Sequence, residues 1–249
     1  MKKRTKKNGL SAAVMGCYGV IALLFVVILL GGCNAESTVT PDAAGAVQWK
    51  YLYYNGSRQE IEITDSNIDN DHIVVPENID GAAVTAIGAN AFHKKRMSYI
   101  TLPGTVKVIR SGAFSGSQNL RKIVLPGVVE KIETTAFYNC LSLESIETEA
   151  SVHFKSENGV LYSKDMTVLV AYPEGKWDRE YYLPQSVEKI EAAAFGCRPR
   201  LRDIYVLNDN LEFPQAALCT QTDGITLHGS EGSTAQKYAG QWGIAFEAL

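Results

Sequence analysis

The stretch that decides the fold runs from residue 102 to residue 147, where LPGTVKVIRSGAFSGSQNLRKIV is followed at once by LPGVVEKIETTAFYNCLSLESIE. In both halves the leading Leu-Pro pair is followed by Val, Ile, Ala-Phe, Leu and Ile, at offsets of 4, 7, 11, 12, 18 and 21 from the Leu. A third copy with the same offsets begins at Leu183, and an imperfect copy begins at Val75. Eight positions that recur without a shift predict stacked structural repeats.

Each copy divides into two parts by the spacing of its apolar residues. Ile123 and Leu125 lie two apart, which is typical of a short strand with one face in a core, and Pro126 ends that strand. Ile132 and Ala136 have helical spacing, so a helical turn is expected in the second part. One such unit cannot bury its apolar face alone. The sequence therefore predicts an α/β repeat solenoid, with short parallel strands and helical turns.

These residues resemble the BspA-type (treponemal) leucine-rich repeat, whose consensus is roughly Leu-Pro-x-x-Val-x-x-Ile-Gly-x-x-Ala-Phe-x-x-Cys-x-x-Leu-x-x-Ile. Cys140 lies at the Cys position of that consensus, and Ser117 replaces it in the preceding copy. The resemblance covers residues 73–206 directly. It implies a leucine-rich-repeat solenoid with an opening β-hairpin and a closing cap, because both ends of an open core must be covered.

The resemblance and the repeat together give the expected organisation of the chain. A β-hairpin cap is expected over residues 47–74, the repeats over 75–206 and a C-terminal cap over 207–249. The Leu-Pro spacing jumps from 23 to 58 residues between Leu125 and Leu183, which leaves a β-hairpin insertion at 148–182. This insertion either completes a sheet or projects as an aromatic loop that contacts a partner. Its aromatic residues are Tyr162, Tyr172, Trp177, Tyr181 and Tyr182.

The N-terminus is typical of an export signal. A basic start, MKKRTKK, precedes a long apolar run and then Leu30-Gly31-Gly32-Cys33, the order of a bacterial lipoprotein signal peptide. Residues 1–32 are therefore predicted to be removed, Cys33 to be lipidated and residues 33–46 to form a flexible tether. The alternative is an uncleaved helix over Leu10–Leu30, which is about long enough to span a bilayer. Both interpretations place the folded body outside the cytoplasm, attached to the membrane at the cell surface.

Charge argues against nucleic acid as a partner. Five of the first seven residues are basic, and without them 19 basic and 27 acidic residues remain, a net charge of −8. A body of this sign repels nucleic acid.

The search for chemistry predicts no enzyme, no cofactor and no metal site. The four histidines are far apart in sequence, and none has a partner at metal-ligand spacing. Cys140 is expected to pack as a small apolar residue or, alternatively, to form a disulfide with Cys197. The enzyme alternative is a glycan hydrolase that uses Glu130 and Glu188 as paired carboxylates.

The strand residues that alternate with the buried ones predict the binding surface. They form a mixed polar and aromatic stripe: Tyr99, Thr101, Lys122, Val124, Ser145, Glu147, Asp203 and Tyr205. Such a stripe suits an extracellular protein or glycan, so the predicted function is binding at the cell surface, including adhesion. The alternative is a scaffold lipoprotein of the bacterium's own envelope with no host ligand.

Overall fold

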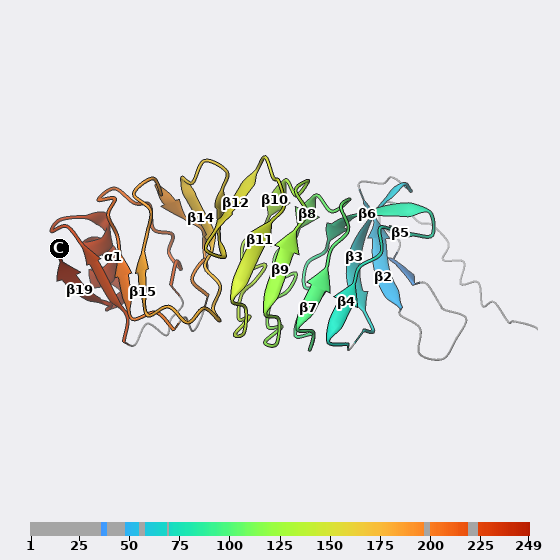
Figure 1. The fold of residues 1–249 in the computed structure, drawn as a ribbon, viewed down its shortest axis with the longest axis horizontal. Helices are drawn as coiled ribbons and strands as arrows, with labels where there is room; N and C mark the ends of the chain where they lie inside the picture. Colours follow the sequence, from blue (N-terminus) through green and yellow to red (C-terminus); the bar gives the residue numbers. More distant parts are fainter. Residues whose placement is uncertain (1–35, 39–47, 55–57, 69, 197–199, 219–223) are drawn as a thin grey trace, which may run out of the picture. The chain divides into compact units, whose positions relative to one another are not determined.

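The strands of successive repeats pair in parallel and form a sheet that we call the front sheet (Figure 1). The structure is a computed structural model that describes residues 36–38, 48–54, 58–68, 70–196, 200–218 and 224–249. The front sheet consists of β4 (His72–Val74), β7 (Tyr99–Thr101), β9 (Lys122–Leu125) and β11 (Ser145–Thr148). Ile100, Ile123 and Ile146 lie opposite one another and are buried. The register therefore follows the repeat, because a slip of one residue would turn these side chains to solvent.

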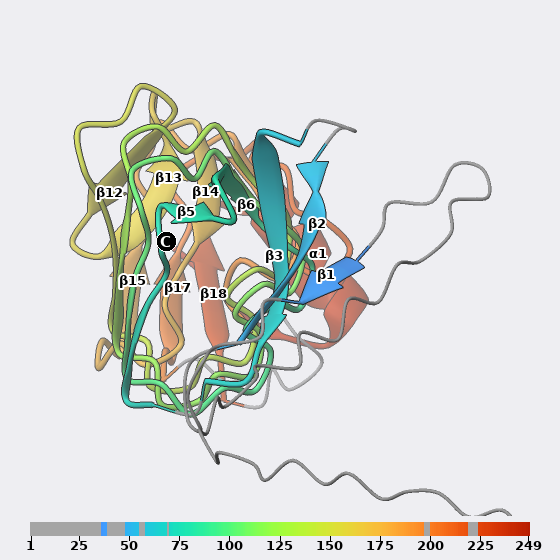
Figure 2. The same cartoon turned by 90° about the vertical axis from the view of Figure 1, so that its right-hand side faces the viewer.

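Each coil then continues into a second sheet, the back sheet, whose repeat strands are shorter. Its members are β1 (Glu36–Thr38), β2 (Trp49–Tyr53), β3 (Glu60–Ser66), β5 (Asn78–Ile79), β6 (Ala82–Ile87), β8 (Val108–Ile109) and β10 (Lys131–Ile132). β1, β2 and β3 pair antiparallel at the start of the stack, whereas β3, β6, β8 and β10 pair in parallel. Figure 2 shows the coils one behind another, with β2 and β3 along one side. Within the predicted tether 33–46, residues Glu36–Thr38 thus form a strand.

Each of these coils contributes one Phe to the hydrophobic core, beside buried aliphatic residues. Phe92, Phe114 and Phe137 stack with ring centroids 5.7 and 5.6 Å apart and planes within 5° of parallel. Trp49 from β2 meets Phe92 edge-on at 6.3 Å and covers the N-terminal end of this stack. Stacked rings at this spacing add to the free energy gained by burying their area, so the Ala-Phe pair of the repeat is a main source of cohesion between coils.

The predicted helical turns are wrong, because the segments around each Ala-Phe pair are successive turns. The residue before each pair, namely Asn90, Gly112, Thr135 or Ala193, has a left-handed φ of 58°, 67°, 64° or 58°. A right-handed helix needs φ near −60° at every residue. The backbone N–H groups instead donate in turn to the next coil and to their own turn. Phe92 N–H donates to the Ala113 carbonyl of the next coil at 2.7 Å, and Ala91 N–H donates to the Gly88 carbonyl of its own turn at 3.2 Å.

The insertion forms a three-stranded β-structure that returns the chain to the repeat. β12 (Phe154–Glu157), β13 (Val160–Ser163) and β14 (Val168–Ala171) pair antiparallel, and β14 then pairs in parallel with β16 (Lys189–Ile190). The buried side chains of β13 belong to two different hydrophobic clusters. Leu161 packs in the N-terminal cluster, whereas Val160 and Tyr162 pack in the C-terminal one.

The C-terminal part repeats the parallel arrangement in another sheet, which we call the end sheet. It contains β15 (Glu180–Tyr182), β17 (Asp203–Tyr205), β18 (Thr226–Gly229) and β19 (Ala245–Ala248). The helix α1 (Thr234–Trp242) begins at Ser233, whose side chain accepts from Gln236 N–H, and ends at Gly243 in the left-handed conformation. In the part of the chain that the structure describes, no helix is long and apolar enough to cross a membrane.

Cys140 is a free thiol in the core, so the alternative of a disulfide with Cys197 is wrong; Cys197 itself lies outside the described residues. The Cys140 Sγ donates a hydrogen bond to the Phe114 carbonyl at 3.1 Å. In the preceding coil, Ser117 Oγ donates in the same way to the Phe92 carbonyl at 2.6 Å. Burial raises the pKa of the Cys140 thiol to about 12. The position therefore calls for a small hydrogen-bond donor and gives the thiol no reactivity.

The left-handed residues provide a test of the turns. Replacing Ala193 by Gly should raise the free energy of unfolding by about 0.5–1 kcal/mol, because a left-handed Ala costs more than the extra entropy of Gly. The measurement is urea unfolding. The adjacent, buried Ala194 lacks a positive φ, so Ala194→Gly should instead lower stability by about 1–2 kcal/mol. A helix at this segment would make both changes destabilising, and that result would contradict the turn structure.

The Cys140 position gives a second prediction. Cys140→Ser should change the free energy of unfolding by less than about 1 kcal/mol, since its hydroxyl can repeat the hydrogen bond of Ser117. Cys140→Ala removes that donor and should cost about 1–2 kcal/mol. Equal losses in the two variants, measured by urea unfolding, would show that the hydrogen bond contributes nothing.

Candidate binding surface

The front sheet brings six of the eight predicted binding residues together on its outward face. Two rows run across the strands in register: His72, Tyr99, Lys122 and Ser145 in one, and Val74, Thr101, Val124 and Glu147 in the other. The exposed fractions of Val74, Tyr99 and Val124 are 59%, 45% and 40%. The face therefore presents apolar side chains to solvent beside polar ones, as protein-binding surfaces do.

The polar residues of this face are held by one another. Lys122 Nζ lies 2.7 Å from Glu147 Oε1, and Ser145 Oγ donates to the same carboxylate at 3.2 Å. The hydrogen bond from Lys122 lowers the pKa of Glu147. His72 Nε2 and Thr101 Oγ1 form a hydrogen bond at 2.9 Å. These contacts link the polar side chains beside Tyr99 and Val124 across neighbouring strands.

The other two predicted residues, Asp203 and Tyr205, lie on β17 in the end sheet. The insertion separates that strand from β11 along the chain, and its Gly159 carbonyl accepts a hydrogen bond from Ile146 N–H at the end of the front sheet. The predicted stripe is therefore divided into a front-sheet surface and an end-sheet surface.

The end-sheet surface carries an aromatic ladder, which we define as Tyr182, Tyr205 and His228. Tyr182 and Tyr205 stack with centroids 4.1 Å apart and planes 4° from parallel, and Tyr205 and His228 stack at 4.4 Å and 13°. His228 Nε2 lies 2.8 Å from Asp203 Oδ1 and its Nδ1 lies 3.7 Å from Glu247 Oε2. The hydrogen bond to Tyr182 raises the pKa of Tyr205 to about 12.

Sequence reasoning left the two outer members of this ladder out of the predicted stripe and named Tyr182 only among the aromatic residues of the insertion. Tyr182 lies 23 residues before Tyr205 and His228 lies 23 residues after it, which is the period of the repeat. Extending that period across the insertion and into the C-terminal cap would have found both. His72 and Val74 precede Tyr99 and Thr101 by 27 residues, so the 23-residue period misses them. Alignment on the Val75-Pro76 pair of the imperfect copy would have found both, because they precede it as Tyr99 and Thr101 precede Leu102-Pro103.

The aromatic residues of the insertion do not form one projecting group. Tyr162 and Tyr172 are buried, and Tyr181 is partly buried against the C-terminal cluster. Trp177 is 73% exposed, with the Arg200 guanidinium carbon 3.4 Å from its ring centroid. Of the five aromatic residues, Trp177 and Tyr182 are therefore exposed, and the other three pack against the C-terminal cluster instead of projecting.

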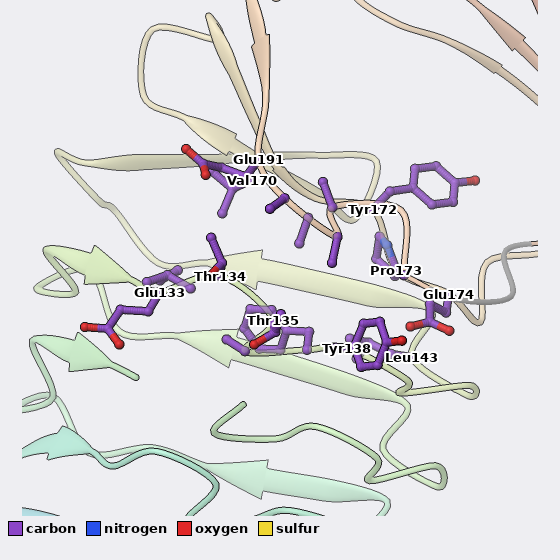
Figure 3. Close-up of a pocket in the computed structure, with 18 residues that line it drawn as sticks. Glu133, Thr134, Thr135, Tyr138, Leu143, Val170, Tyr172, Pro173, Glu174 and Glu191 are labelled. Atoms are coloured by element: carbon purple, nitrogen blue, oxygen red, sulfur yellow. The ribbon is translucent and has the colours of Figure 1, made fainter. Parts of the chain in front are cut away.

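The hollows of the molecule lend no support to a paired-carboxylate enzyme. The cavity in Figure 3, between Glu133 and Thr135 of one coil and Val170 and Glu191 of later ones, has a volume of about 30 Å³. That is room for a water molecule, far below the ~300 Å³ of the smallest ligand pockets. Glu130 lines a wider, open hollow of about 600 Å³ with Lys107, Glu149 and His153, and Glu188 does not line it.

The predicted absence of a metal site and the predicted lipid anchor can be compared with the described residues only. Among the described residues, no three His, Cys, Asp or Glu side chains are grouped so that they could hold a metal ion. The predicted lipidation site Cys33 and the predicted signal peptide 1–32 lie outside the described residues.

Solved structures of bacterial leucine-rich repeat proteins are similar to this chain at low sequence identity. A leucine rich repeat protein from T. pallidum has 20% sequence identity and a TM-score of 0.47, over 80% of this chain and 95% of that one. A leucine rich cell surface protein from Faecalibacterium prausnitzii has 14% identity and a TM-score of 0.42, over 86% and 95%. The pneumococcal vaccine antigen PcpA has 18% identity and a TM-score of 0.41, over 72% of this chain and 66% of its own. None of the curated proteins matches the sequence.

The sequence family gives the more direct assignment. The model for the BspA type leucine rich repeat region matches residues 85–167, which include the front-sheet strands β7, β9 and β11. Residues 85–167 of this chain are therefore BspA-type leucine-rich repeats.

Proposed function

We propose that this protein is a lipid-anchored, non-catalytic binding module on the bacterial cell surface, whose front-sheet face contacts an extracellular protein. The observation that carries the proposal is the group of exposed apolar residues on one sheet face, with Val74 and Val124 in one row and Tyr99 in the other. Exposed apolar side chains lose water when a partner covers them, and aromatic residues are favoured contact points at interfaces. The BspA-type repeats at residues 85–167 support a role in protein interaction.

The geometry of the face favours recognition without chemistry. Its side chains form two rows that run across the strands. Neighbouring side chains within a row are one strand spacing apart, so they present a regular surface to a partner. The ion pair between Lys122 and Glu147 borders Val124 and orients both charges before binding. Attachment to a host surface is the form of binding that we would test first.

The binding test compares cells that display the full-length wild-type chain or the Tyr99→Ala/Val124→Ser double variant. Binding to immobilised extracellular matrix proteins should fall at least tenfold in the double variant, because truncating an interface anchor costs about 1–2 kcal/mol or more. Leu207→Ala is the matched control, since Leu207 is 47% exposed outside the front sheet. Equal binding by wild type and double variant would contradict the proposal. Binding to glycans alone would change the partner class, and no binding to either would favour an envelope scaffold.

The anchor has its own test. The mass of the chain extracted from membranes should equal residues 33–249 plus acyl chains, because acylation at Cys33 precedes removal of residues 1–32. The Cys33→Ala variant should lose the acyl mass. A mass equal to all 249 residues in both forms, apart from the substitution, would instead show an uncleaved N-terminal helix.

A further inference from the structure

The aromatic ladder of the end sheet is open at one end. Tyr205 has a stacked ring on both faces, Tyr182 on one side and His228 on the other. Tyr182 is 56% exposed, and among the described residues Tyr205 is the only ring stacked on it. The second face of Tyr182 is therefore available for another flat group, which would lie about one strand spacing further along the ladder.

The surroundings of that face are acidic. Glu180 lies two residues before Tyr182 on β15, so both side chains project from the same face of the sheet. Glu180 pairs in register with Asp203, whose carboxylate already contacts His228. Among the described residues, no ion pair includes Glu180. The charges of Glu180 and Asp203 also contribute to the raised pKa of Tyr205.

The same part of the chain holds one guanidinium on an aromatic ring. Arg200 lies over Trp177 with 3.4 Å between the guanidinium carbon and the ring centroid. Trp177 comes three residues before β15 and Arg200 three before β17. Stacking of a guanidinium on an exposed ring is thus already part of this structure, and Tyr182 offers a second ring with a carboxylate beside it.

We infer that the end-sheet surface binds an arginine side chain of a partner protein, with the guanidinium stacked on Tyr182 and paired with Glu180. Arginine fits this site better than lysine, because a planar guanidinium can stack on the ring and donate two parallel hydrogen bonds to a carboxylate at once. The site is chemically distinct from the front-sheet surface, which is more apolar. The inference rests on the proposed function in that the protein must bind a partner, and it adds which side chain that partner presents.

The test measures binding of an octapeptide of alternating Gly and Arg to the full-length protein in detergent, at physiological salt. Peptides in which lysine or neutral citrulline replaces each Arg are the comparison. The arginine peptide should bind most tightly. Tyr182→Leu and Glu180→Gln should each weaken its binding about three- to fivefold, as expected for the loss of one cation–π contact or one exposed ion pair.

The control variants lie outside both surfaces. Glu77→Gln changes the net charge by the same amount as Glu180→Gln at another exposed position, and Trp242→Leu removes another exposed ring, so both should bind the arginine peptide as the wild type does. The inference is overturned if these controls weaken binding equally, if Tyr182→Leu has no effect, or if the lysine peptide binds as tightly as the arginine peptide. The isosteric Glu180→Gln separates lost recognition from lost folding. Failure here leaves the front-sheet proposal intact, because that proposal is decided by Tyr99→Ala/Val124→Ser on cells.

Discussion

Each coil of this protein leaves backbone groups that only the neighbouring coil can satisfy. The strands of the front and back sheets donate across the stack, and so do the turns, where Phe92 N–H reaches the Ala113 carbonyl and Phe114 N–H reaches that of Ala136. A buried amide without a partner costs about as much as a lost hydrogen bond. This constraint keeps the strands and turns of adjacent coils in register, so a longer coil, such as the 27 residues from Val75 to Leu102, must place its extra residues between these hydrogen-bonded segments. It also keeps Phe92, Phe114 and Phe137 directly over one another.

The parts of the fold that could be predicted from the sequence are those with a strict apolar period. The alternation around Ile100, Ile123 and Ile146 correctly gave strand direction, register and the outward face. The spacing of Ile132 and Ala136 did not distinguish a helix from successive turns, because both place apolar residues on one side every three to four positions. The left-handed residue decides between them. Gly112 and Asn90 are residues that favour such a φ, but Thr135 and Ala193 take the same conformation without any sign of it in their type.

The binding residues were likewise predictable only where they follow the apolar period of the repeat. Alternation selected outward residues on both sheets, but it could not show that the insertion divides them, since a hairpin's place in space does not follow from its length. What results is a molecule with two surfaces of different character. Val74, Tyr99 and Val124 lie on one, and Tyr182, Tyr205 and His228, with carboxylates beside them, lie on the other. A single partner that spans both surfaces would join two weak contacts into one stronger attachment.

The position of β13 couples the unfolding of the two hydrophobic clusters. Solenoids are commonly approximated as chains of independent units, in which one part can unfold while the rest persists. Here Leu161 belongs to the N-terminal hydrophobic cluster and Val160 and Tyr162 to the C-terminal one. Loss of either cluster exposes one face of the strand that the other cluster needs. The insertion thereby makes the two halves thermodynamically dependent on each other, and it is the place where a repeat array becomes a single cooperative domain.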